Sequence, residues 1–299
     1  MSLGPKLSPP TRLHYLEADL KRLHELGASH HPVIPTGRLP HLDVAYHVQH
    51  YQGIPGGDSI SLRHLQTVDH GRGGRKTSYY WAHHLDWVGK GLRANAISRV
   101  FSSGLSHILS KIRFIPGQEN RTLKRIASDA HGFMVNAGFD FDHAQVFAQG
   151  NMKLIAVEHG GRLPSKVRVH YLNFAGMPFF VRRSAPTVAP LDFFSPGHGL
   201  PVPADNLGLF LKDDPVSYKP KTLELGRGDA LVSYSDGIEE ARNRSHRFFG
   251  LHLLEQAGRW QLHSAEDFVS RTIRSLRYFV RRSEHPIEDA SVLVIRHAP

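Results

Sequence analysis

Apolar and polar residues alternate along several short stretches of the chain. Leu42, Val44, Tyr46 and Val48 are apolar and the residues between them are mostly polar, as in a strand with one buried face. Similar alternation, or a short apolar run between turn residues, predicts further strands at 59–65, 78–85, 144–147, 152–157, 167–174, 230–234 and 291–296. Strands therefore account for much of the expected structure.

Three other stretches carry apolar residues at the three- and four-residue spacing of a helix, namely 92–112, 120–135 and 264–280. The third has a clear helix start, because Ser264 can cap the first turn and acidic residues follow it directly. Strands and helices come in separate groups and do not alternate one by one. This order predicts an α+β fold.

The first 38 residues are expected to form a helix and a linker, ahead of a single domain at 39–299. The helix is expected at 11–26 and carries a stripe of leucines spaced as in a coiled coil. The stripe consists of Leu13, Leu16, Leu20 and Leu23. Two heptads are too short for a stable free coiled coil, so the stripe must be buried. It either packs on its own domain or pairs two chains as a homodimer, and both interpretations stay open.

Composition narrows the classes of function. The 299 residues are 40% hydrophobic, which is enough for a full core. No stretch approaches the ~20 apolar residues of a membrane span, and the N-terminus lacks the apolar region of a signal peptide. We therefore expect a cytoplasmic protein. The absence of cysteine excludes disulfides, thiolate catalysis and cysteine-based zinc sites.

The formal net charge of +10 favours acidic partners, phosphorylated proteins among them. Lysine and arginine are scattered along the chain. The densest clusters, at 72–76 and 281–282, are short and lack interleaved aromatic residues. We therefore expect no binding to nucleic acid.

Four short segments place a carboxylate at a turn next to an apolar run. The acids are Asp58, Asp86, Asp236 and the pair Glu288 and Asp289. A rigid strand can hold each acid at the edge of a cleft, and a neighbouring glycine allows a sharp turn. Acids that converge repel one another unless hard cations such as Mg²⁺ or Mn²⁺ neutralise them. Each segment alone is a weak signal, because an Asp-Gly pair after a strand is ordinarily a turn.

The order of these segments resembles that of a known family. Residues 233–243, Ser-Tyr-Ser-Asp-Gly-Ile-Glu-Glu-Ala-Arg-Asn, are similar to the Tyr-Thr-Asp-Gly-Val-(Thr)-Glu-Ala-Arg-Asn signature of the PPM metal-dependent serine/threonine phosphatases, in their bacterial SpoIIE/RsbU-like branch. Other segments resemble that branch in the same order, over about 39–296: Gly56-Gly-Asp58, Asp86-Trp-Val-Gly-Lys-Gly91, Tyr171-Leu-Asn-Phe-Ala-Gly-Met-Pro178, Phe249-Gly250 with Leu253-Leu254, and Glu288-Asp-Ala-Ser-Val-Leu-Val-Ile295.

The resemblance implies a β-sandwich of two antiparallel sheets flanked by α-helices, in α-β-β-α layers. It also implies two divalent ions, Mn²⁺ or Mg²⁺, at one end of the sandwich. Asp86 would bridge both ions, and the backbone carbonyl of Trp87 would complete one of them. Asp236 and the acid of the last segment would hold the other, with Asp58 close by and acting through water.

Several assignments stay open within this resemblance. The family acid of the last segment falls on Glu288, but Asp289 could replace it by a one-residue slip. Lys90 and Arg93 could meet the substrate phosphate at the start of a helix, or could be solvated charges. The general acid is unassigned.

Two adjacent histidines suggest a rival metal site. His83 and His84 lie beside Asp86 and could offer imidazole ligands. Adjacent residues of a strand point to opposite faces, however, so the two rings cannot both reach one ion. We expect both to be core or surface histidines instead.

The predicted function is metal-dependent hydrolysis of phosphoserine or phosphothreonine, catalysed through Asp58, Asp86 and Asp236. The expected partner, implied by the resemblance, is a phosphorylated anti-anti-sigma (STAS-domain) regulator in bacterial partner-switching signalling. The alternative is a catalytically weak or inactive scaffold of the same fold, because Glu288 departs from the family pattern.

Overall fold

The computed structural model describes residues 37–50, 57–71, 74–87, 92–136, 148–161, 164–174, 179–184, 218–281, 283, 287 and 289–298. The predicted helix at 11–26 with its leucine stripe, and the predicted strand at 144–147, lie outside these ranges. The division into a segment at 1–38 and a domain at 39–299 therefore stays a prediction.

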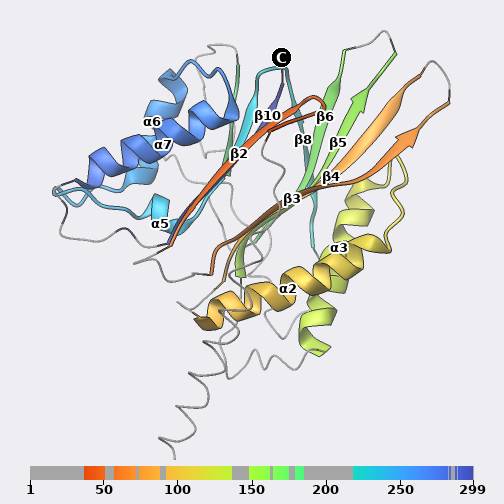
Figure 1. Ribbon diagram of the computed structural model, residues 1–299, viewed down its shortest axis with the longest axis horizontal. Coiled ribbons are helices and arrows are strands. Elements are labelled where there is room, and N and C mark those ends of the chain that lie inside the picture. The colour runs from red at the N-terminus through yellow and green to blue at the C-terminus, as the bar shows by residue number, and fades with distance from the viewer. Residues whose placement is uncertain are drawn as a thin grey trace, which may run out of the picture.

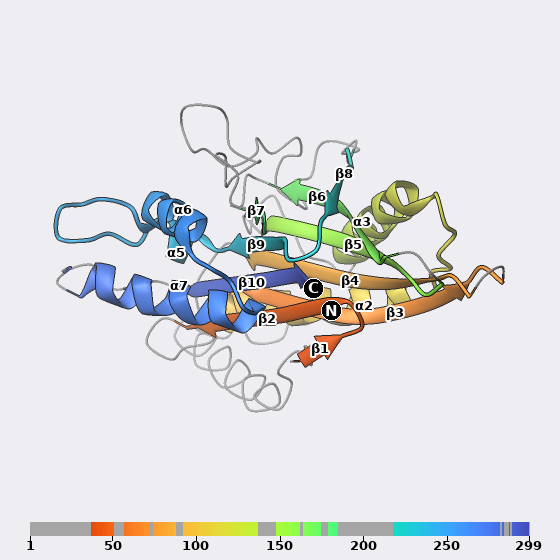
Figure 2. The same cartoon turned by 90° about the horizontal axis from the view of Figure 1, so that it is seen from above.

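Two five-stranded antiparallel sheets lie face to face (Figures 1 and 2). The first sheet has the order β1 (Gly37–Leu39), β2 (Leu42–Gln49), β10 (Ala290–His297), β9 (Ala230–Tyr234) and β7 (Phe179–Arg182). The second has the order β3 (Ser59–Asp69), β4 (Lys76–Trp87), β5 (Ala148–His159), β6 (Lys166–Phe174) and β8 (Lys221–Leu225). Strands from distant parts of the chain are thus neighbours, as where β10 pairs with both β2 and β9.

Helices cover the outer face of each sheet (Figure 1). On the second sheet lie α2 (Leu92–Ser110) and α3 (Glu119–Asn136), and on the first lie the short α5 (Asp236–Glu239), α6 (Phe249–Arg259) and α7 (Ala265–Val280). The predicted α-β-β-α layering is therefore confirmed. Among the described helices, none combines the length and apolar character that crossing a membrane requires.

The apolar residues form three layers of core. One layer lies between the second sheet and helices α2 and α3, the next lies between the two sheets, and the third lies between the first sheet and helices α6 and α7. Strand β4 contributes to two of them by alternation: Tyr79 and Trp81 face the helices, whereas Tyr80 and Ala82 face the other sheet. The same alternation directs Asp86 toward the space between the sheets.

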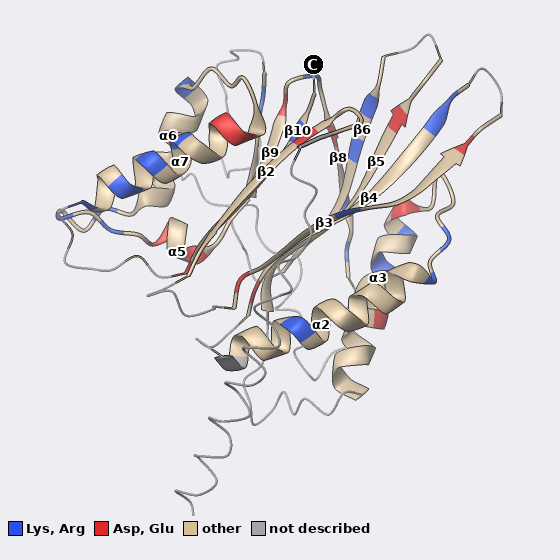
Figure 3. Cartoon of the chain, in the orientation of Figure 1, with Lys and Arg blue, Asp and Glu red and all other residues tan. Residues whose placement is uncertain are grey.

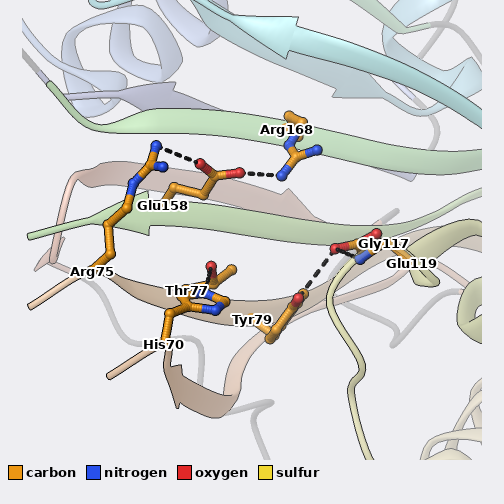
Figure 4. A network of polar contacts seen from close by, with 8 residues as sticks. All are labelled: His70, Arg75, Thr77, Tyr79, Gly117, Glu119, Glu158 and Arg168. Carbon is orange, nitrogen blue, oxygen red and sulfur yellow. Dashed lines mark hydrogen bonds and ion pairs between the residues drawn. The ribbon is translucent and has the colours of Figure 1, made fainter. Parts of the chain in front are cut away.

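A polar network ties the start of α3 to the second sheet (Figure 4). The buried carboxylate of Glu119 accepts a 3.1 Å hydrogen bond from the Tyr79 hydroxyl. Nearby, Glu158 forms ion pairs with Arg75 at 3.3 Å and with Arg168. The Glu119 contact holds the start of α3 on the sheet, and the Glu158 ion pairs join β5 to β6 and to the turn before β4.

Candidate functional site

The predicted acids lie at strand ends from both sheets. Asp86 is the next-to-last residue of β4, and Asp58 directly precedes β3, whose first residue, Ser59, pairs with Leu85. In the other sheet, Asp236 follows β9 as the first residue of α5, and Asp289 directly precedes β10. Acidic residues, red in Figure 3, gather at the strand ends that lie between α5 and α2. The antiparallel topology thus brings four acids from distant segments to one end of the sandwich.

A glutamine side chain joins the acids of the two sheets. The Nε2 amide of Gln149 donates hydrogen bonds to Oδ2 of Asp86 at 2.9 Å and to Oδ2 of Asp236 at 3.1 Å. Gln149 is fixed in place because its backbone lies opposite Asp86 in the β4–β5 register. Both carboxylates therefore lie within reach of a single amide group.

Asp58 is an acid with little compensation for its burial. Both of its carboxylate oxygens are inaccessible to solvent, and a hydrogen bond with Ser291 only partly offsets the cost of burial and the charge of Asp86. A buried carboxylate in this state is costly unless a cation or a proton neutralises it. Oxygen donors of this kind are the ligands that Mg²⁺ and Mn²⁺ prefer, so the acids fit such ions. Within the described parts of the chain, however, no three His, Asp or Glu side chains already encircle one ion position.

Burial and mutual repulsion change the pKa values of these acids. Burial, followed by the charge of Asp236, raises the pKa of Asp86 to about 7. Burial, followed by the charge of Asp86, also raises the pKa of Asp58 well above its ordinary value. Without a cation, the cluster therefore retains protons at a pH where ordinary carboxylates have lost them.

The pKa of Asp86 predicts how metal-free stability changes with pH. Because its pKa is about 7 in the folded chain and 3.8 ordinarily, Asp86 contributes stability below pH ~4 that is lost as the pH rises through about 7. Buried histidines such as His83, whose pKa is lowered to about 3, make the folded chain less stable as the pH falls below 6.5. The effect of Asp86 is therefore isolated by comparing wild type with a variant of that residue. In chelator, the stability advantage of Asp86→Asn over wild type should be larger at pH 8 than at pH 5, by on the order of 2 kcal/mol. Urea unfolding of both proteins at pH 5 and at pH 8 measures this advantage. An equal advantage at the two pH values would contradict the raised pKa.

Two glycines let the metal-site segments approach closely. A Cβ atom on Gly57 would lie 2.5 Å from the carbonyl oxygen of Trp87, the atom predicted to complete one ion. A Cβ atom on Gly237 would overlap the carbonyl oxygen of Asp289. The glycines beside Asp58 and Asp236 are therefore required by close packing of the backbone, in addition to any turn.

The other predicted site residues are placed less completely. The Trp87 indole is buried in the core beneath α2, with its ring centroid 5.1 Å from that of Phe101, and the ligand role of its backbone carbonyl stays a prediction. Glu288, Lys90 and the side chain of Arg93 lie outside the described part of the structure. The choice between Glu288 and Asp289, and the phosphate contacts of Lys90 and Arg93, stay predictions.

A buried polar layer lies directly beneath the acids. His84 of the second sheet contacts two strands of the first, with Nδ1 3.2 Å from Oγ of Ser233 and Nε2 2.7 Å from Oγ of Ser291. The ammonium of the fully buried Lys153 donates to Asn151 and, at 3.5 Å, to Ser233. This layer joins the sheets two residues away from Asp86 and Asp289. No local sequence pattern indicated it, because its partners are far apart in the chain.

The adjacent histidines do point to opposite faces of β4. His83 contacts Oγ of Ser59 at 3.1 Å and accepts from the Trp81 indole at 3.0 Å, on the face that packs against α2. His84 faces the other sheet, and burial, with a further contribution from Lys153, holds its pKa well below the ordinary value. Both are buried, hydrogen-bonded core histidines, as expected.

Comparison with known proteins agrees with this architecture. Residues 76–298 match the family described as Stage II sporulation protein E (SpoIIE). The PP2C phosphatase domain of Bacillus subtilis SpoIIE, solved with a fragment of its regulatory domain, is 19% identical with a TM-score of 0.56; the match covers 86% of this chain and 62% of that one. No curated protein matches the chain in sequence.

Two further structures share the fold. The RsbU and RsbW domains of Rv1364c from Mycobacterium tuberculosis are 16% identical with a TM-score of 0.53, covering 86% of this chain and 62% of that one. The SiaA-PP2C domain of Pseudomonas aeruginosa is 13% identical with a TM-score of 0.56, covering 97% of both chains. The chain thus spans 62% of the length of the SpoIIE and Rv1364c chains. Because the family match extends over most of the chain, the protein belongs to the SpoIIE family of PPM (PP2C-type) serine/threonine phosphatases.

Proposed function

We propose that this chain hydrolyses phosphoserine or phosphothreonine in a protein substrate, with two Mn²⁺ or Mg²⁺ ions held at the end of the sandwich. One observation carries the proposal: two carboxylates from distant segments meet around a single amide, beside a third whose oxygens are both inaccessible to solvent. Such an arrangement costs free energy in a folded protein, and a divalent cation relieves that cost.

Each residue has a distinct part in the proposed reaction. Asp86 would hold both ions and the Trp87 carbonyl would hold one, while Asp236 would hold the other together with Glu288 or Asp289. When bound, the ions supply a water activated for in-line attack and a clamp for the phosphoryl group. Asp58 would lie close by and act through water. Neutral His84 and its serine partners hold the two sheets in register beneath the site.

The substrate is proposed to be a phosphorylated STAS-domain regulator of bacterial partner-switching signalling. Membership of the SpoIIE family supports this choice, as does a net charge of +10 that favours a phosphorylated, acidic partner. Lys90 and Arg93 are proposed to contact its phosphate. A cytoplasmic location and pairing of two chains through the leucine stripe are further proposals that belong to this setting.

A scaffold without turnover is the second candidate, favoured by the Gln149 amide between the two acids and by glutamate at position 288. Phosphate release from a phosphoserine peptide, with MnCl₂ or with EDTA, distinguishes the two. The phosphatase predicts steady release that depends on Mn²⁺ and stops in chelator. Equal release after the metal is stripped would contradict the two-ion mechanism, and no release despite bound Mn²⁺ would favour the scaffold.

The same assay on a phosphorylated STAS domain tests the substrate class. Its kcat/KM should exceed that of a peptide cut from around its phosphoserine, because a folded partner contacts more of the protein surface than the phosphorylated segment alone. Equal values for the two substrates would contradict recognition of the STAS fold while leaving the phosphatase activity intact.

A further inference from the structure

The side chain of Gln149 lies between Asp86 and Asp236 and forms a hydrogen bond with each. Its backbone lies in β5 opposite Asp86 of β4, and the pairing of β5 with β6 begins at the next residue, Gly150. The side chain is half-buried and spans from Asp86 at the end of β4 to Asp236 at the start of α5.

The direction of the amide is fixed by its charged neighbours. Both contacts use the Nε2 amino group, which has two N–H donors and so can satisfy one oxygen of each carboxylate. The reverse orientation would leave these two acceptor oxygens without the amide donors. Hydrogen bonds from the amide offset part of the cost of holding carboxyl groups in a low-dielectric site. Gln149 therefore stabilises the acid pair when no cation is present.

The same contacts interfere with binding of an ion. An N–H group cannot ligate a cation, and the Gln149 N–H groups are directed at one carboxylate oxygen of each acid, Oδ2 of Asp86 and Oδ2 of Asp236. An ion that bridges the two acids must first displace the amide and replace both hydrogen bonds.

We propose that Gln149 closes the acid pair in the metal-free protein and must be displaced for metal to bind, so that this residue lowers metal affinity. The inference rests on the proposed metal centre. It makes Gln149 a positioning residue for the two acids.

The test compares Gln149→Met with wild type. Methionine keeps the length of the side chain but removes both donors, so it leaves no large cavity. Titration of chelator-stripped protein with MnCl₂ in a calorimeter should show affinity increased about tenfold in the variant, the factor that ~1.4 kcal/mol produces. Thermal unfolding of the same proteins in EDTA should show a lower midpoint for the variant, because its acid pair has lost two hydrogen bonds.

A matched control is Gln66→Met. Gln66 is a half-buried glutamine of β3, in the same sheet, where it pairs with Tyr79. This variant should bind MnCl₂ with wild-type affinity. An equal affinity for Gln149→Met and wild type would overturn the inference, and so would a weaker affinity, which would make Gln149 a metal ligand. Absence of MnCl₂ binding in every protein would instead contradict the proposed metal centre itself, and the Gln149 role with it.

Discussion

Asp86→Ala is expected to lower metal-dependent phosphatase turnover by about a thousandfold, the effect of losing several kcal/mol of transition-state stabilisation. Asp86 is proposed to hold both ions, so its loss removes the group that keeps them together. Its carboxylate also accepts a hydrogen bond from the Gln149 amide, which contacts Asp236 as well. Initial rates on a phosphoserine peptide in saturating MnCl₂, with calorimetric titration of MnCl₂, measure both losses.

Unfolding does not explain the expected loss of activity. Removing a buried acid whose pKa is raised by burial and by Asp236 relieves repulsion, so metal-free Asp86→Ala should be at least as stable as wild type at pH 8. Asp129→Asn is the matched control, because Asp129 is an exposed acid of α3 that pairs only with Arg125 among the ion pairs of the described residues. Its turnover should stay at the wild-type value. Near-normal turnover of Asp86→Ala would contradict the assigned role.

Gly237→Ala is expected to destabilise the folded chain by about 2–3 kcal/mol and to weaken Mn²⁺ binding. A methyl group there overlaps the backbone carbonyl of Asp289, so the start of α5 and the segment entering β10 must separate. Both segments carry acids of the proposed site, Asp236 and Asp289. Urea unfolding in EDTA measures the stability, and MnCl₂ titration measures the site.

Gly132→Ala provides the contrasting glycine. Gly132 lies within α3, and a Cβ atom there would meet nothing within 4 Å. Alanine should therefore stabilise the helix by roughly 0.5–1 kcal/mol, since glycine loses more conformational freedom on folding. If both glycine variants changed stability equally, close contact with Asp289 would not be the cause of the Gly237 effect.

Much of the fold could be predicted because its main strands carry their pattern locally. The stretches 230–234 and 291–296 were placed almost to the residue, against Ala230–Tyr234 and Ala290–His297. Strands β1, β7 and β8 and helices α5 and α6 were not predicted. Strands β1 and β7 are only three and four residues long, and β8 is five. Elements so short have too few positions to show a period, and their pairing with distant strands decides their structure.

The candidate site also has a part that could be predicted from local sequence and a part that could not. Asp58, Asp86 and Asp236 could be singled out from sequence because each stands beside glycine or a strand end and matches a family motif in order. Gln149 could not, because its two partners are 63 and 87 residues away along the chain. His84 and Ser291 are 207 residues apart. Such contacts depend on the way the sheets stack, which local periodicity does not report.

The most direct test is to locate Mn²⁺ in crystals of the protein by anomalous scattering. The proposed centre predicts ions between Asp86 and Asp236, with carboxylate oxygens as ligands and the Gln149 amide turned away from both acids. An intact fold with ordered acids and no anomalous signal at this position in millimolar MnCl₂ would contradict the two-ion centre, and with it the proposed mechanism of phosphate hydrolysis.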